Sequence, residues 1–109
     1  FSDHLREGAL QKVLTEHLLK KVIHDNEITI AYQPQLNAQQ QMIGVEALVR
    51  WHNKTLGDVP PSTFIPIAEE VGFMPELGRH IAYLTLSEMG QLQQKLQQTF
   101  EVSMNISVR

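Results

Sequence analysis

Residues 43–51 read IGVEALVRW, and this stretch decides the fold because its side chains alternate in character with a period of two. One alternating set is entirely apolar, whereas the other holds Glu46 and Arg50 on either side of Leu48. Such alternation predicts a β-strand with one apolar face and one charged face. A half-exposed strand whose charges face solvent is the simpler interpretation. If the charged face instead lies inside a sheet, its acid and base need a partner or a ligand.

Two predicted elements precede this strand. Apolar residues at spacings of three and four predict an amphipathic helix over residues 9–24. From Ile28 the period changes to two, and this strand is expected to end near Pro34, which has no amide hydrogen for a ladder. Polar residues 37–41 then suit a loop between neighbouring strands. The sequence therefore predicts a helix followed by two adjacent strands.

Two further helices are predicted after the second strand. Turn-forming residues fill 53–61 and end where a short helix can begin. Ser62 or Thr63 is expected to cap that helix, and Gly72 to close it. A longer helix follows from about Pro75. The order helix, strand, strand, helix, helix, strand is an α/β pattern without an internal domain boundary.

The last predicted strand, residues 102–108, carries Asn105 and Ser107 on its polar face. If it joins the same sheet, Glu46 and Asn105 could present a carboxylate and an amide oxygen at one end of that sheet. Oxygen ligands suit magnesium, manganese or calcium better than zinc. A solvated edge strand accounts for the pattern equally well, and two ligands do not make a complete site. Because no helix follows to cover this strand, we also expect self-association through open sheet edges.

Composition narrows the class of protein. The chain has 109 residues, 42% of them hydrophobic, and a formal net charge of -3, which fits one globular unit. With 9 basic against 12 acidic residues and no basic block, the sequence argues against DNA or RNA as a partner. The absence of cysteine excludes disulfides, thiolate zinc sites and thiol nucleophiles. No segment has the apolar length of a membrane span, and no positively charged start leads into an apolar signal segment. A cytoplasmic location is therefore expected, with any membrane anchor elsewhere in a longer parent.

Five landmarks, in order and spacing, resemble the EAL domain family. They are Tyr32-Gln33-Pro34-Gln35, Gly44 to Trp51, Gly57 to Pro61, Phe64 to Glu70, and Asn105-Ile106-Ser107. The triplet Glu46-Ala47-Leu48 matches the family's name, but three common residues recur by chance, so the resemblance depends on the ordered set. It implies a phosphodiesterase that hydrolyses the bacterial second messenger cyclic di-GMP to linear pGpG. It also implies a modified (β/α)8 barrel, similar to a TIM barrel, whose first strand runs antiparallel to the rest.

The resemblance assigns roles to five residues. Glu46 resembles the family's first metal-binding carboxylate, and Asn105 resembles the amide ligand of the same Mg²⁺ or Mn²⁺ centre. Arg50 resembles the arginine that contacts a substrate phosphate, a task suited to a permanently charged fork of donors. Gln33 and Leu48 match positions that line the nucleotide pocket. In the family, two metal ions activate a water and stabilise the in-line displacement at phosphorus.

The resemblance also implies a partial barrel, truncated after about three strands and covering roughly the first two fifths of an EAL domain. Residues 9–109 would form this N-terminal part, and residues 1–8 a linker or the tail of a preceding diguanylate-cyclase or sensory domain. The family's further metal-binding carboxylates, its lysine and its final glutamate lie downstream of the Asn-x-Ser strand. We therefore expect the parent to be a phosphodiesterase and the isolated chain to be inactive.

Two alternatives to an enzyme stay open. One is a degenerate EAL domain that binds cyclic di-GMP or a protein without hydrolysing anything. The other is an independent interaction domain in which Glu46 and Arg50 simply pair on an exposed sheet. Intact downstream carboxylates and lysine would favour the enzyme over both.

Overall fold

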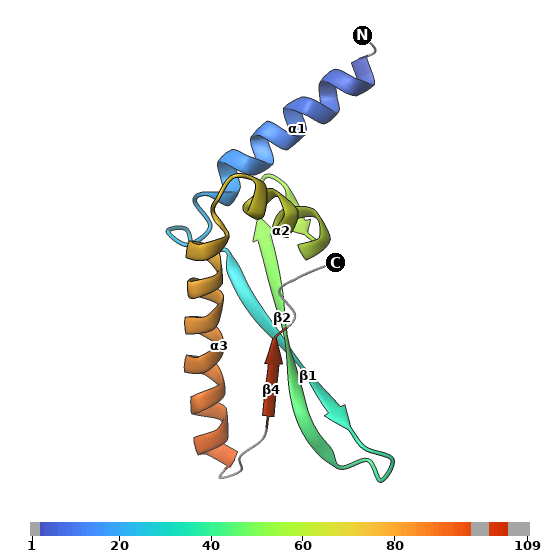
Figure 1. Cartoon of the computed structure of the whole chain (residues 1–109), viewed down its shortest axis with the longest axis vertical. Helices are drawn as coiled ribbons and strands as arrows, with labels where there is room; N and C mark the ends of the chain where they lie inside the picture. Colours follow the sequence, from blue (N-terminus) through green and yellow to red (C-terminus); the bar gives the residue numbers. More distant parts are fainter. Residues whose placement is uncertain (1–2, 97–100, 105–109) are drawn as a thin grey trace.

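The computed structural model describes residues 3–96 and 101–104, which form one sheet with three helices (Figure 1). In chain order the elements are α1 (Asp3–Leu19), β1 (Ile28–Leu36), β2 (Met42–Asn53), β3 (Gly57–Val59), α2 (Pro61–Glu70), α3 (Met74–Leu96) and β4 (Glu101–Met104). The α/β class predicted from the sequence is confirmed. None of the helices in this part of the chain is long and apolar enough to cross a membrane.

Strand β2 is the centre of the sheet because it has neighbours on both edges. β1 runs antiparallel along one edge, from the pair Ile28 and Trp51 to the pair Leu36 and Met42. β3 and β4 share the other edge: β3 pairs antiparallel with 51–53, and β4 pairs parallel with 44–47. The parallel pair is joined by a crossover through α2 and α3, as parallel strands require.

The last strand joins the same sheet, which the sequence left as a condition, because β4, Glu101–Met104, pairs with β2. Asn105 and Ser107, the polar residues predicted on that strand, lie outside the described residues. The first strand is antiparallel to β2, whereas β4 is parallel to it, as the resemblance implied.

The core lies between the apolar face of the sheet and the helices α2 and α3. Trp51 is only 1% exposed and meets the ring of Phe64 edge to face, with ring centroids 5.6 Å apart and planes at 86°. α2 packs against β2, and α3 packs against β1. The buried apolar residues of this cluster include Ile28, Ile30, Ala47, Val49, Ile65, Ala68, Leu77 and Ile81. One face of the sheet is therefore covered by helices, and its polar face is left for other contacts.

The first helix differs from its prediction. α1 ends at Leu19 rather than near residue 24, and the chain passes through turns to Asn26, whose φ is 53°. Leu10 and Val13 are each 61% exposed, although their spacing suggested a buried stripe. The reason is geometric, because the start of α1 points away from the sheet (Figure 1), and the helix packs against α2 and joins the core only through its last turn. Local periodicity identifies a helix but does not identify what covers it.

The start of α2 also differs from its prediction. Neither Ser62 nor Thr63 caps the helix, because it begins at Pro61, after Pro60 in an extended conformation. No side chain caps this end, and a proline at the first helical position loses no intrahelical hydrogen bond. Gly72 follows the helix with a φ of 75°, so its predicted role in ending α2 is confirmed.

Two features of the strands differ from their predictions. β1 passes through Pro34 to Leu36, which is tolerated because β1 has a single neighbour within the described part of the sheet. The segment expected to be only a turn contains the three-residue strand β3, which closes a short hairpin with the end of β2. Three residues are too few to show a period of two.

Candidate functional site

Four of the five predicted site residues share the polar face of the sheet. On β2, Glu46 and Leu48 are half-buried and Arg50 is exposed, while the residues between them are buried in the core. Gln33 of β1 lies directly across from Glu46, and Ser103 of β4 lies across from it on the other edge. Directly paired residues project from the same face of a sheet. A polar row therefore crosses three strands at Glu46.

Asn105 is the fifth predicted site residue, and it lies outside the described residues. Its part in a metal centre stays a prediction. In the sequence, Asn105 directly follows Met104, the last residue of β4 that pairs with β2.

Glu46 and Arg50 do not form an ion pair with each other in the structure. They are four residues apart on one strand, which separates their backbones by about 13 Å. Neither side chain has a hydrogen-bond or ion-pair partner within residues 3–96 and 101–104. A carboxylate and a guanidinium on this face are thus both available to a ligand, and the interpretation that they neutralise each other loses its basis.

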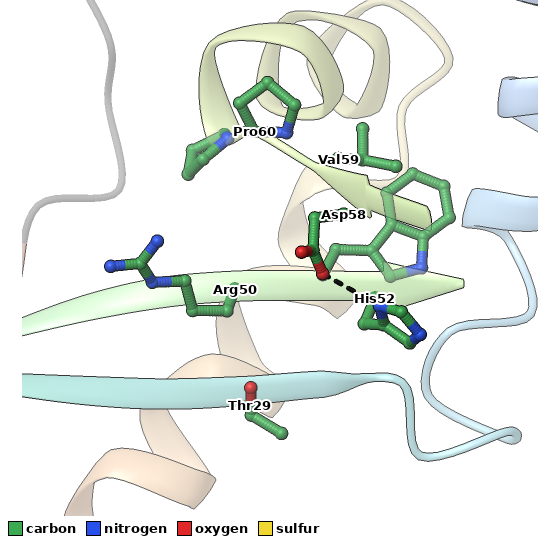
Figure 2. A pocket seen from close by; sticks show the side chains of 8 residues that line it. Thr29, Arg50, His52, Asp58, Val59 and Pro60 are labelled. Carbon is green, nitrogen blue, oxygen red and sulfur yellow. Dashed lines mark hydrogen bonds and ion pairs between the residues drawn. The ribbon is translucent and has the colours of Figure 1, made fainter. Parts of the chain in front are cut away.

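A pocket of about 370 Å³ continues this face beyond Arg50 (Figure 2). Its lining comes from the ends of β1 and β2, from β3, and from the start of α2: Thr29, Arg50, Trp51, His52, Asp58, Val59, Pro60 and Pro61. At its rim, Nδ1 of His52 lies 2.8 Å from Oδ1 of Asp58. His52 follows Arg50 at the same period of two, so the alternation could have identified it. Asp58 belongs to β3, a strand that the sequence pattern did not predict, so no local signal identified it.

The end of β2 is fixed by a hydrogen-bond network centred on Glu27. The Glu27 carboxylate accepts from Nε1 of Trp51 at 3.1 Å and from Nδ2 of Asn53 at 3.1 Å to each oxygen. Oδ1 of Asn53 in turn accepts from the backbone amides of Thr55 and Leu56 at 2.8 and 3.0 Å. The network joins the turn before β1 to the turn between β2 and β3. It therefore holds Arg50 and the pocket rim in one arrangement.

Tyr32 anchors the other side of β1. Its hydroxyl donates to Oε1 of Glu88 on α3 at 2.7 Å. Burial, together with that hydrogen bond and the negative charge of Glu88, raises the pKa of Tyr32 above the ordinary tyrosine value. Because Tyr32 holds β1 to α3, its neighbour Gln33 is held on the opposite, polar face.

The described residues supply one of the predicted metal ligands. Glu46 is an oxygen donor of the kind that Mg²⁺ and Mn²⁺ prefer. Within residues 3–96 and 101–104, no three His, Asp or Glu side chains are grouped closely enough to hold a metal ion. The Glu46 carboxylate thus suits a divalent metal as an oxygen donor, but a complete metal site needs further ligands beside it.

Similar proteins place the fold and its motifs in a family. The family model described as EAL domain matches residues 15–109. The oxygen sensor protein DosP of Escherichia coli K12 is 40% identical over 82 residues, which are 74% of this chain and 10% of DosP. The cyclic di-GMP phosphodiesterase PdeR of the same organism is 28% identical over 109 residues, which are 100% of this chain and 16% of PdeR.

Solved structures agree with the sequence relatives. A MucR phosphodiesterase in complex with cyclic di-GMP superposes with a TM-score of 0.79 at 27% identity, over 86% of this chain and 38% of that one. The EAL enzyme Bd1971, bound to cAMP and cyclic di-GMP, also gives 0.79, at 28% identity, over 91% of this chain and 29% of that one. The chain thus spans a small part of each curated relative and about a third of these solved chains. Its sequence, its antiparallel first strand and its superposition agree: the chain belongs to the EAL domain family.

Proposed function

We propose that this chain contributes the first metal ligands and the phosphate-binding arginine of an EAL phosphodiesterase that hydrolyses cyclic di-GMP to pGpG. The observation that carries the proposal is the common polar face of Gln33, Glu46, Leu48 and Arg50. Two similar proteins support the choice of substrate, because PdeR is named a cyclic di-GMP phosphodiesterase and the MucR structure contains cyclic di-GMP.

Each residue on this face has a chemical task in the proposal. Arg50 is exposed and has no acidic partner in the described part of the chain, so its guanidinium is free to bind a phosphate oxygen. Glu46 and Asn105 would hold Mg²⁺ or Mn²⁺, which when bound supplies an activated water and stabilises charge at phosphorus. Gln33, across from Glu46, can orient substrate or ligands through its amide. Leu48 supplies apolar contact between the two charged residues.

The proposal extends to the surroundings of the domain. Residues 1–8 would connect to a preceding diguanylate-cyclase or sensory domain, and residues 9–109 would belong to the EAL domain. Cyclic di-GMP is a bacterial second messenger, so this function implies a cytoplasmic site of action. Catalysis would need further carboxylates beside Glu46, and we expect the isolated chain to bind metal and nucleotide without turnover.

Titration of the isolated, ¹⁵N-labelled chain with Mn²⁺ and with cyclic di-GMP tests the proposal. Mn²⁺ should broaden amide signals around Glu46, and cyclic di-GMP should shift signals near Gln33 and Arg50. Glu46→Gln should remove the local broadening, whereas Glu16→Gln on α1 is the matched control and should leave it intact. Broadening that is unchanged in Glu46→Gln would contradict the metal role.

A non-catalytic receptor is the alternative that the same titration separates. This alternative is favoured by Gln33 and Arg50, because neither side chain needs a metal ion to contact a nucleotide. A receptor should bind cyclic di-GMP equally with and without Mg²⁺, and equally in Glu46→Gln. The enzyme's site should bind it more tightly when Mg²⁺ is present, and only in the chain that retains Glu46.

A further inference from the structure

The pocket beyond Arg50 contains a carboxylate to which the proposed function gives no role. We propose that Asp58 is a specificity-determining residue that recognises the donor edge of a guanine base, and that His52 is its positioning residue. The inference rests on the proposed function, since it concerns the nucleotide whose phosphate Arg50 would bind. It adds a base-reading group at the pocket rim.

The pocket presents opposite charges that do not neutralise each other. Arg50 extends along one side, and Asp58 lies between it and His52 (Figure 2). Arg50 and Asp58 line the same pocket without forming an ion pair with each other. Oδ1 of Asp58 is engaged by His52, and the structure records no partner for its Oδ2 within the described residues. A ligand that fits both groups needs an anionic part and a hydrogen-bond donor part.

A guanine nucleotide has these two parts. The Watson–Crick edge of guanine offers two adjacent donors, the ring N1–H and the 2-amino group, and an ionised carboxylate accepts hydrogen bonds only. Adenine offers an acceptor at N1 and has no 2-amino group, so the same carboxylate disfavours it. Pro60 and Pro61 line the pocket with apolar ring surface against which a base can pack. The pocket of about 370 Å³ is within the size range of small-ligand sites.

The contact with His52 fixes the orientation of the exposed Asp58 carboxylate. Asp58 is 93% exposed, and nothing but the 2.8 Å contact with His52 Nδ1 restrains its carboxylate among the described residues. The two residues are direct cross-strand partners in the hairpin of β2 and β3. The Glu27 network fixes the turn of that hairpin through Asn53. The sheet thus delivers the carboxylate to the rim at a defined place.

A comparison of the affinities of two cyclic dinucleotides for the isolated chain tests the inference. Cyclic di-GMP and cyclic di-AMP are titrated separately while ¹⁵N amide signals of residues 50–61 are followed. We expect cyclic di-GMP to bind about tenfold more tightly, as charge-assisted hydrogen bonds allow. Asp58→Asn should abolish this preference, because its amide offers donors as well as an acceptor. Asp25→Asn is the matched control, since Asp25 forms a similar exposed pair with His24 at 3.0 Å.

Variants of His52 separate positioning from a merely structural role. His52→Leu should reduce the preference for cyclic di-GMP. His52→Gln, whose amide can still donate to Asp58, should retain much of that preference. The two variants should have the same melting temperature, so that the difference between them reflects positioning of Asp58 and not stability.

The outcomes distinguish this inference from the proposed function. A preference that survives in Asp58→Asn overturns the inference and leaves the proposed function standing. Failure of cyclic di-GMP to perturb Gln33, Glu46 or Arg50 overturns both.

Discussion

Glu27 accepts hydrogen bonds from two buried side chains. Replacing Glu27 by alanine should therefore destabilise the fold more than replacing an exposed acidic residue by alanine. Trp51 and Asn53 are 1% and 4% exposed, so neither can exchange the lost acceptor for bulk water without opening the core. Each buried donor left without an acceptor costs about 1–3 kcal/mol. Glu27→Ala should therefore lower the free energy of unfolding by about 2–6 kcal/mol, a large share of the roughly 5–15 kcal/mol typical of domains.

Urea unfolding followed by the fluorescence of Trp51, the single tryptophan of the chain, measures this loss directly. Glu70→Ala is the matched control, because Glu70 forms an exposed ion pair with Lys12 at 3.1 Å. Such a surface pair contributes about 1 kcal/mol at most. In Glu27→Ala, the amides of Thr55 and Leu56 should also exchange faster with solvent, because the Asn53 side chain that accepts from them is no longer fixed.

A loss of unfolding free energy in Glu27→Ala that is no larger than in Glu70→Ala would exclude a stabilising role for the Glu27 carboxylate. That result would mean that water or a rearranged side chain satisfies the two donors. It would also mean that this network does not position Arg50 and the pocket rim.

Further predictions concern pH, backbone conformation and assembly. The folded chain raises the pKa of Tyr32 above its unfolded value of about 10, so the unfolded chain ionises first as pH rises. The stability contributed by the Tyr32 contact is then fully present below pH ~10 and lost above it, and Tyr32→Phe should flatten this decline in urea midpoints measured between pH ~8 and ~11. Gly72→Ala should cost about 1 kcal/mol because its φ is 75°, whereas Gly90→Ala, inside α3 with open space around it, should gain about 1 kcal/mol; equal melting temperatures would contradict this. Open sheet edges should cause concentration-dependent self-association of the isolated chain, and a strictly monomeric sedimentation profile at high concentration would rule it out.

The sequence was most informative where local pattern and side-chain burial coincide. The alternation around Glu46 correctly predicted which face of β2 enters the core and which stays polar. The same period placed Leu48 and Arg50 with Glu46, and the EAL landmarks added Gln33 from the neighbouring strand. These residues share a face because side chains alternate between the two faces of a strand, and this period of two can be read directly from the sequence.

Contacts between distant segments were beyond a reading of local pattern. Nothing in the turn at Glu27 indicates that its carboxylate receives Asn53 from 26 residues away. The exposure of Leu10 depends on the direction in which α1 leaves the sheet, which helical periodicity does not encode. Pro61 begins α2 ahead of the expected serine or threonine cap because a proline fits the first helical position without any capping side chain.

The arrangement of strands around β2 has a consequence for the order of folding. β1, β2 and β3 form a continuous meander within residues 28–59, so its ladders can close as soon as that segment leaves the ribosome. β4 has to return to the middle of β2 after two helices, a longer loop whose closure costs more entropy. Gln33, Glu46, Arg50 and Asp58 all belong to the early meander. The residues proposed to meet the nucleotide would thus be in register before the parallel part of the barrel begins to assemble, and pulse-labelled hydrogen exchange should find the β1–β2 amides protected before those of β4.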